Sequence, residues 1–88
     1  VARIGGEEFI IVMPNTALNN AVNFAERLRE KIEKLEVNVD EHDVSLTVSI
    51  GVCQWHTEQF PNAEAFVAHA DRSLYLAKNA GRNKVVAV

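Results

Sequence analysis

The sequence predicts an α/β domain in which helices pack on a small sheet, and three observations support this class. Short apolar runs rich in β-branched residues alternate with segments whose apolar residues recur every three or four positions. The order of these segments is strand, strand, helix, strand, helix, strand. Hydrophobic residues make up 48% and charged residues 24% of the 88 residues, which is typical of one folded domain or a part of one.

The first segment is predicted to be a β-hairpin. Residues 1–4 have the pattern of a strand end, and the glycine pair at residues 5–6 allows a tight turn because glycine accepts positive φ. Residues 9–13 form an apolar run that Pro14 stops, so we expect a second, buried strand there. The acidic pair at residues 7–8 then lies at the tip of the hairpin.

The middle of the chain is predicted to hold a helix, a loop and a strand. Thr16 suits the N-cap of the helix, and the polar residues 37–43 suit a solvent loop. Residues 44–53 alternate apolar and small or polar side chains, which predicts one continuous strand. The apolar positions of the helix recur at spacings of three and four: Ala21, Phe24, Ala25, Leu28, Ile32 and Leu35.

The last segment is predicted to be a connection, a helix and a strand. Residues 55–61 form the connection, and Asn62 is a suitable N-cap for the second helix. Gly81 is expected to end this helix as a left-handed residue, and residues 84–88 to form the last strand. One face of the helix carries Phe66, Ala70, Leu74 and Ala77.

Charge and composition exclude several classes of protein. The net charge of −3 argues against a chain that coats nucleic acid or an acidic membrane. The single cysteine, Cys53, excludes an intramolecular disulfide and a metal site made of thiolates alone. The apolar runs are far shorter than the roughly 20 residues that span a bilayer. We therefore expect a cytoplasmic domain without nucleic acid and without direct membrane contact, although a parent protein with a membrane anchor is compatible with this.

The predicted hairpin tip is the first candidate for chemistry. Gly5 and Gly6 would let the backbone approach a ligand, and the carboxylates of Glu7 and Glu8 are the hard oxygen ligands that Mg²⁺ prefers. Neighbouring side chains of a strand point to opposite faces, so one of the two acids would serve a given metal ion. The alternative is an ordinary hairpin that carries two solvated acids, and the residues alone favour it because acidic turns are common.

The second candidate is the group of cations at the end of the second helix. Lys78 lies in the last predicted turn, Arg82 follows the glycine stop, and Lys84 comes just beyond. Such donors suit a polyphosphate. The alternative is that Lys78 only complements the negative end of the helix dipole while Arg82 extends into water.

Three separated segments together resemble one family. Residues 2–9, Ala-Arg-Ile-Gly-Gly-Glu-Glu-Phe, are similar to the signature of GGDEF-domain diguanylate cyclases. Residues 46–52, Leu-Thr-Val-Ser-Ile-Gly-Val, resemble a strand of that family, and residues 70–83, which end in Gly-Arg-Asn, resemble its helix end. The resemblance implies that residues 1–88 are the C-terminal part of one GGDEF domain. It implies an α+β sandwich of the nucleotidyl-cyclase type that lacks its N-terminal half with the central strand.

The resemblance also implies roles for the two acids. Glu7 matches the signature acid that binds the catalytic Mg²⁺ (or Mn²⁺) and helps to deprotonate the attacking 3′-hydroxyl of GTP. Glu8 matches the second signature acid, which supports the site and is a further candidate for metal binding. Both would be catalytic residues.

The glycines and the cations would bind the substrate. Gly5 and Gly6 match the glycines that line the nucleotide, and Lys78 and Arg82 match the basic pair that holds the β- and γ-phosphates of GTP. The implied reaction condenses two GTP into cyclic di-GMP and pyrophosphate in a homodimer, under the control of an upstream sensor domain. The resemblance therefore implies an enzyme of bacterial signalling.

The resemblance further implies that much of the nucleotide site precedes Val1. The second metal-binding aspartate, the phosphate loop and the residues that read guanine all belong to the first half of the family's domain. We therefore expect the 88-residue chain alone to be inactive as a cyclase. Its uncovered sheet edges would favour self-association.

Two other functions remain open at this point. The parent could be a degenerate GGDEF module that binds GTP or a partner protein and regulates an attached domain. Alternatively, the chain is a generic α/β interaction module, in which case the three matches are coincidental.

Overall fold

The computed structural model describes residues 2–3, 9–56 and 58–87. It has two helices, α1 (Leu18–Glu33) and α2 (Ala63–Asn79), within these ranges. The strands are β1 (Ala2–Arg3), β2 (Phe9–Ile10), β3 (Glu36–Val39), β4 (His42–Ser45), β5 (Ile50–Val52) and β6 (Val85–Ala87). This mixture of helices and strands confirms the α/β class in its coarse form.

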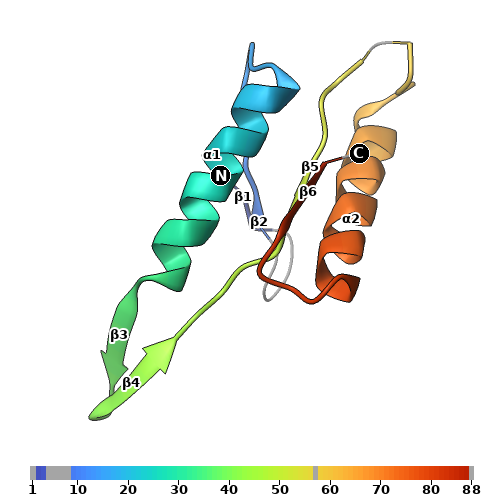
Figure 1. Ribbon diagram of the computed structural model, residues 1–88. Coiled ribbons are helices and arrows are strands. Elements are labelled where there is room, and N and C mark those ends of the chain that lie inside the picture. The colour runs from blue at the N-terminus through green and yellow to red at the C-terminus, as the bar shows by residue number, and fades with distance from the viewer. Residues whose placement is uncertain (1, 4–8, 57, 88) are drawn as a thin grey trace.

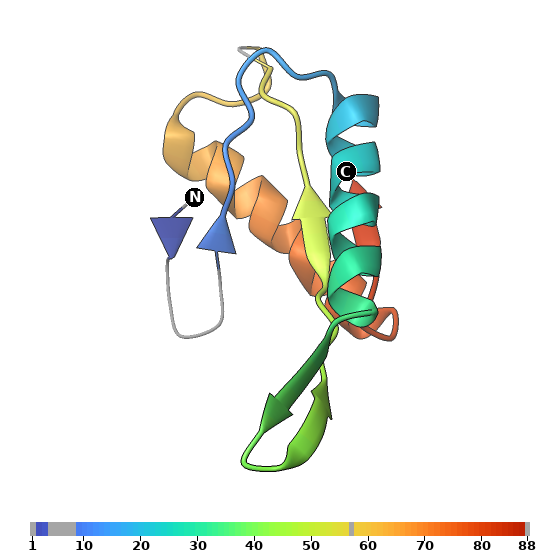
Figure 2. The same ribbon diagram turned by 90° about the vertical axis from the view of Figure 1, so that its left-hand side faces the viewer.

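The parallel pair β5–β6 is the centre of the molecule. Ile50 pairs with Val85 and Val52 with Ala87, and both helices contact the pair. Figure 1 shows β5 and β6 between α1 and α2, and Figure 2 shows the same arrangement from the side. Because α2 connects two parallel strands, β5, α2 and β6 form a β-α-β unit.

The N-terminal hairpin is confirmed, but its second strand is shorter than expected. Ala2 pairs with Ile10 and Arg3 with Phe9, and β2 ends at Ile10 rather than at residue 13. The expectation of a buried strand is wrong, since Phe9 is 63% and Val12 is 74% exposed. An apolar run indicates a strand whose side chains pack against another layer. In the described part of the chain, no layer covers most of this run.

Helix α1 begins one residue later than the sequence suggested. Its N-cap is Ala17, in extended conformation and without a capping hydrogen bond from a side chain. The Thr16 hydroxyl instead donates a 3.0 Å hydrogen bond to the Pro14 carbonyl oxygen. The predicted N-cap is therefore wrong: the helix is capped one residue further on, and the Thr16 hydroxyl makes a local turn contact.

The expected solvent loop at residues 37–43 is also wrong, since these residues belong to the hairpin β3–β4. Asp40 and Glu41 both have positive φ, 51° and 67°, as the central residues of a tight two-residue hairpin turn do. Val37 pairs with Val44 on the two strands. Figure 1 shows the hairpin projecting away from the two helices. The expected continuous strand at residues 44–53 is accordingly divided into β4 and β5.

The second half of the chain follows the prediction closely. The Asn62 side-chain oxygen accepts a 2.9 Å hydrogen bond from the Ala65 backbone nitrogen, so this N-cap is confirmed. Gly81 has φ 117° and follows the C-cap of α2, as expected of a left-handed stop. The last strand is confirmed as β6. None of the helices in the described ranges is both long and apolar enough to cross a bilayer.

The buried core is small and lies around α2. Ala25 of α1, Phe60 of the connection, and Ser73 and Ala77 of α2 are buried. Phe60 also contacts Phe66, with ring centroids 5.3 Å apart. The core therefore consists mainly of small side chains that let the helices lie close to the central strands.

Candidate functional site

The four residues predicted at the hairpin tip, Gly5, Gly6, Glu7 and Glu8, lie outside the described residues. The catalytic and metal-binding roles expected for them therefore stay predictions. Within the described ranges, no cluster of three or more histidine, cysteine, aspartate or glutamate side chains could hold a metal ion. The expected donor set is compatible with Mg²⁺, because this ion is commonly bound by one or two carboxylates together with substrate phosphates.

The two predicted phosphate ligands lie at one end of α2. Lys78 is in the last turn of the helix and is half-buried, whereas Arg82 is exposed in the loop that follows. A whole turn of backbone separates them in the chain. The structure thus gathers Lys78 and Arg82 at the C-terminal end of α2.

The backbone after α2 forms a complete Schellman motif. The Gly81 nitrogen donates to the Lys78 carbonyl oxygen at 3.4 Å, and the Arg82 nitrogen donates to the Ala77 carbonyl oxygen at 3.1 Å. These are the two bonds that satisfy the last carbonyls of a helix after a left-handed residue. The motif determines where the chain leaves the helix, and hence where Arg82 begins.

Two further residues of this loop are in the left-handed region. Arg82 has φ 62° and Asn83 has φ 49°. Asparagine adopts this conformation readily, whereas for Arg82 it costs on the order of 1–2 kcal/mol and persists only where neighbouring contacts hold it. The contacts of Asn83 supply this restraint.

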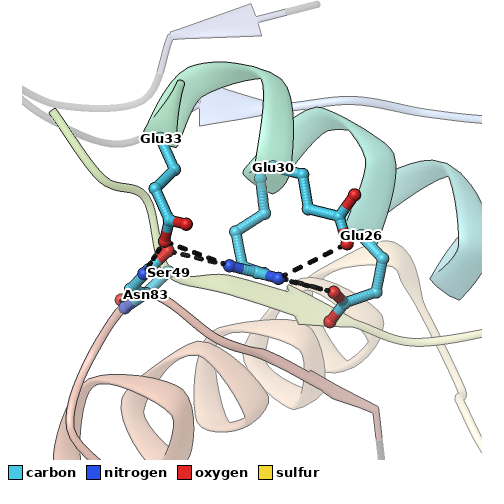
Figure 3. A network of polar contacts seen from close by, with 6 residues as sticks. Glu26, Glu30, Glu33, Ser49 and Asn83 are labelled. Atoms are coloured by element: carbon cyan, nitrogen blue, oxygen red, sulfur yellow. Dashed lines mark hydrogen bonds and ion pairs between the residues drawn. The ribbon is translucent and has the colours of Figure 1, made fainter. Parts of the chain in front are cut away.

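Asn83 is anchored by three hydrogen bonds to other elements (Figure 3). Its backbone nitrogen donates to the Ser49 hydroxyl oxygen at 3.2 Å. Its side-chain oxygen accepts from Nη1 of Arg29 at 3.1 Å, and its side-chain nitrogen donates to a carboxylate oxygen of Glu33. Asn83 therefore joins the loop after α2 to α1 and to the residue that precedes β5.

Arg29 is itself held by acids of its own helix. Its Nε and Nη2 atoms donate to Oε2 of Glu26 at 3.2 and 3.0 Å, and Glu30 and Glu33 complete the ion pairs at 3.8 and 3.5 Å. The Arg29 side chain is only 17% exposed. The hydrogen bond to Glu26 is the main cause that raises the pKa of Arg29 above its ordinary value, against an opposing effect of burial. The guanidinium stays charged throughout the physiological range of pH.

This network was not predicted from the sequence. The Gly-Arg-Asn ending at residues 81–83 pointed to Arg82, but no role was predicted for Asn83, Arg29 or Ser49. The only available signal was the position of Asn83 directly after Arg82. Arg29 gave no signal, because an arginine among acids on an amphipathic helix is ordinary.

The described elements define a mixed α/β module in which two helices pack on a parallel pair of strands and one helix ends beside two cations. The model of the family "Diguanylate cyclase, GGDEF domain" matches residues 1–84, so the chain belongs to this family. This confirms the resemblance that the three sequence segments indicated.

Relatives support the same assignment. The chain is 39% identical over 84 residues to "Diguanylate cyclase A" of Treponema denticola, an overlap that covers 96% of this chain and 22% of the relative. It is 38% identical over 86 residues to "Diguanylate cyclase DosC" of Escherichia coli K12, covering 97% of this chain and 18% of the relative. It is 41% identical over 86 residues to "Response regulator PleD" of Caulobacter vibrioides, covering 96% and 19%. The chain thus spans about a fifth of the length of these relatives.

Proposed function

We propose that the chain is the C-terminal part of a diguanylate cyclase domain that condenses two GTP into cyclic di-GMP and pyrophosphate. The observation that carries the proposal is the match over residues 1–84, which includes an intact Gly-Gly-Glu-Glu-Phe segment at residues 5–9. The gathering of Lys78 and Arg82 at one end of α2 supports it. The complete domain would have the nucleotidyl-cyclase type of fold.

In the proposed reaction, the 3′-oxygen of one GTP attacks the α-phosphorus of the other. A new phosphodiester bond forms, the bond between the α-phosphorus and the bridging oxygen breaks, and pyrophosphate leaves. Glu7 assists removal of the proton from the 3′-hydroxyl and is the candidate metal ligand, with Glu8 beside it. When bound, Mg²⁺ or Mn²⁺ would neutralise negative charge on the phosphates.

The cations have a binding role in this proposal. Lys78 and Arg82 hold the β- and γ-phosphates, the part of the substrate that becomes the leaving group. Gly5 and Gly6 allow close approach of the nucleotide. Since each domain presents one GTP, two copies must meet for the reaction, so a homodimer is part of the proposal. GTP as substrate implies a cytoplasmic domain, and an upstream sensor domain would control the encounter.

The proposal is tested on the full-length protein with its upstream sequence, GTP and Mg²⁺. We expect formation of cyclic di-GMP and pyrophosphate, measured by chromatography and by a coupled phosphate assay. Glu7→Gln should abolish product formation. Lys78→Ala and Arg82→Ala should each raise KM for GTP about 10- to 100-fold, the loss expected for one hydrogen bond to a charged group. Lys31→Ala, a change at an exposed lysine of α1, is the matched control.

Three results would separate the proposal from its alternatives. Unchanged product formation by Glu7→Gln would contradict the assignment of the acid. Tight GTP binding by the wild-type protein without any product would identify a degenerate, regulatory module. Absence of Mg²⁺-dependent GTP binding would point to an interaction module unrelated to nucleotides.

A further inference from the structure

The loop that carries Arg82 is held on both sides of this residue. On the N-terminal side, the Schellman motif ties Arg82 to α2 through the carbonyl oxygen of Ala77. On the C-terminal side, Asn83 is anchored to Ser49, Arg29 and Glu33. Arg82 is therefore a left-handed residue between two fixed points.

The second anchor comes from a distant part of the chain. Arg29 and Asn83 are 54 positions apart, and their hydrogen bond joins α1 to the loop after α2. Figure 3 shows Glu33 and Ser49 converging on Asn83. The position of the Arg82 backbone thus depends on a helix that carries none of the predicted ligands.

Arg29 and Arg82 differ in their charged partners. Arg29 is paired with Glu26, Glu30 and Glu33, so its guanidinium is already neutralised and oriented before it meets Asn83. Arg82 is exposed, and in the part of the chain that the structure describes it forms no ion pair. Arg82 is thus the cation available to an anionic ligand, while Arg29 is a fixed support.

We propose that Arg29, acting through Asn83, is a positioning residue that fixes the loop from which Arg82 engages the terminal phosphates of GTP. This inference rests on the proposed function. It adds that α1 determines the affinity for the triphosphate although it does not contact the substrate. Loss of the support leaves Arg82 present but spread over several backbone conformations, so part of the binding free energy is lost in ordering the loop.

The test uses the full-length protein, with KM for GTP, kcat and the melting temperature measured for each variant. Arg29→Gln is expected to raise KM about ten-fold while kcat stays within about two-fold, as for an interaction lost equally from the ground state and the transition state. Arg29→Lys keeps the charge but not the planar fork, so it should rescue KM only in part. Arg27→Gln, two positions earlier on α1 and outside the network, is the control with unchanged KM.

A double variant separates positioning from an independent effect. If Arg29 acts only through Arg82, Arg29→Gln combined with Arg82→Gln should raise KM no further than Arg82→Gln alone. Asn83→Gly accepts the left-handed backbone but removes the side-chain anchor, so it should reproduce the KM of Arg29→Gln. Ser49→Ala removes the acceptor of the Asn83 backbone nitrogen. If Arg29→Gln fails to fold, this variant provides the same test.

The outcomes distinguish this inference from the proposed function. Should Arg82→Gln raise KM while Arg29→Gln and Asn83→Gly lower only the melting temperature, Arg29 is merely structural and the inference is wrong. The inference would also be wrong if the double variant raised KM by the product of the two single effects. Wild-type KM in Arg82→Gln, or no cyclic di-GMP from the wild-type protein, would contradict the proposed function itself.

Discussion

Gly51 of β5 lies so close to Leu74 of α2 that a Cβ atom on Gly51 would stand 2.3 Å from the Leu74 backbone nitrogen. The same atom would stand 2.5 Å from the carbonyl oxygen of Ala70. Strand and helix therefore meet backbone to backbone at this point, and Ser73, whose backbone also lies against Gly51, is fully buried. The β-α-β unit depends on the absence of a side chain at this position.

We accordingly expect Gly51→Ala to destabilise the chain. The added methyl group meets backbone atoms that cannot rotate away, so α2 must shift, and the cost should reach at least the roughly 1–3 kcal/mol of overpacked cores. The free energy of unfolding from urea titration measures this. Ala68→Ser, on the exposed face of α2, is the control. A loss of less than about 0.5 kcal/mol, the range of ordinary surface changes, would contradict the close packing.

The two predicted N-caps should differ in their effect on stability. Asn62→Ala removes the acceptor for the Ala65 nitrogen and should cost about 1 kcal/mol. Thr16→Ala removes only an exposed bond to the Pro14 carbonyl and should stay within about 0.5 kcal/mol. Thermal unfolding of both variants gives the comparison. Equal losses would show that Thr16 contributes to α1 in a way that the structure does not indicate.

The Cys53 thiol should react slowly at neutral pH. Burial raises the pKa of Cys53 above its ordinary value, which lowers the fraction of reactive thiolate. Because the folded-state pKa is raised, burial of the neutral thiol contributes fully to stability below the unfolded-state pKa of about 8.5. This contribution is lost as the pH rises through the folded-state pKa. Titration with a chromogenic disulfide from pH 7 to 10 measures the rate. The prediction would be refuted if the rate reached half of its maximum at a pH equal to or below that found for a small free thiol.

The 88-residue chain alone should form no cyclic di-GMP. The resemblance places the second metal-binding aspartate and the guanine-reading residues before Val1, so Glu7 would lack its partner carboxylate. Parallel assays of this chain and of a version extended upstream test the expectation, with the extended Glu7→Gln variant as the background. Comparable rates for the short and the extended chain would show that residues 1–88 hold a complete site.

The isolated chain should also self-associate. Phe9, Ile11 and Val12 are 63%, 44% and 74% exposed beside a two-residue strand, and uncovered apolar strands pair with other chains. Light scattering should show a mass that rises with protein concentration, and Val12→Lys should reduce the rise. A monomer at every concentration would indicate that this surface is covered within the chain.

Local signals explain what could be predicted from the sequence. The limits of α2, the Asn62 cap and the Gly81 stop each depend on residues within one helical turn, and all three are confirmed. The sequence also indicates the strands β5 and β6, but β5 is shorter than the strand expected at residues 44–53, and the parallel pairing was not predicted. Thr16 shows the limit of this reasoning, because threonine suits both an N-cap and a local turn, and only the structure shows which role it has.

Other features depend on contacts that no local pattern contains. The turn at Asp40 and Glu41 was hidden because polar residues in a left-handed turn have the same composition as a loop. The contact between Arg29 and Asn83 joins residues 54 positions apart. The roles of the acids and glycines at residues 5–8 stay predictions from the sequence pattern, because these four residues lie outside the described ranges.

The projecting hairpin β3–β4 leaves one part of the molecule free to vary. Its tip, Asp40 and Glu41, is exposed and stands away from the end of α2 (Figure 1). Exposed loop tips are the positions at which inserted residues are best tolerated. A peptide tag or a fluorescent label inserted between these two residues should therefore leave the proposed phosphate ligands undisturbed, and differences in chain length among relatives are expected to concentrate there.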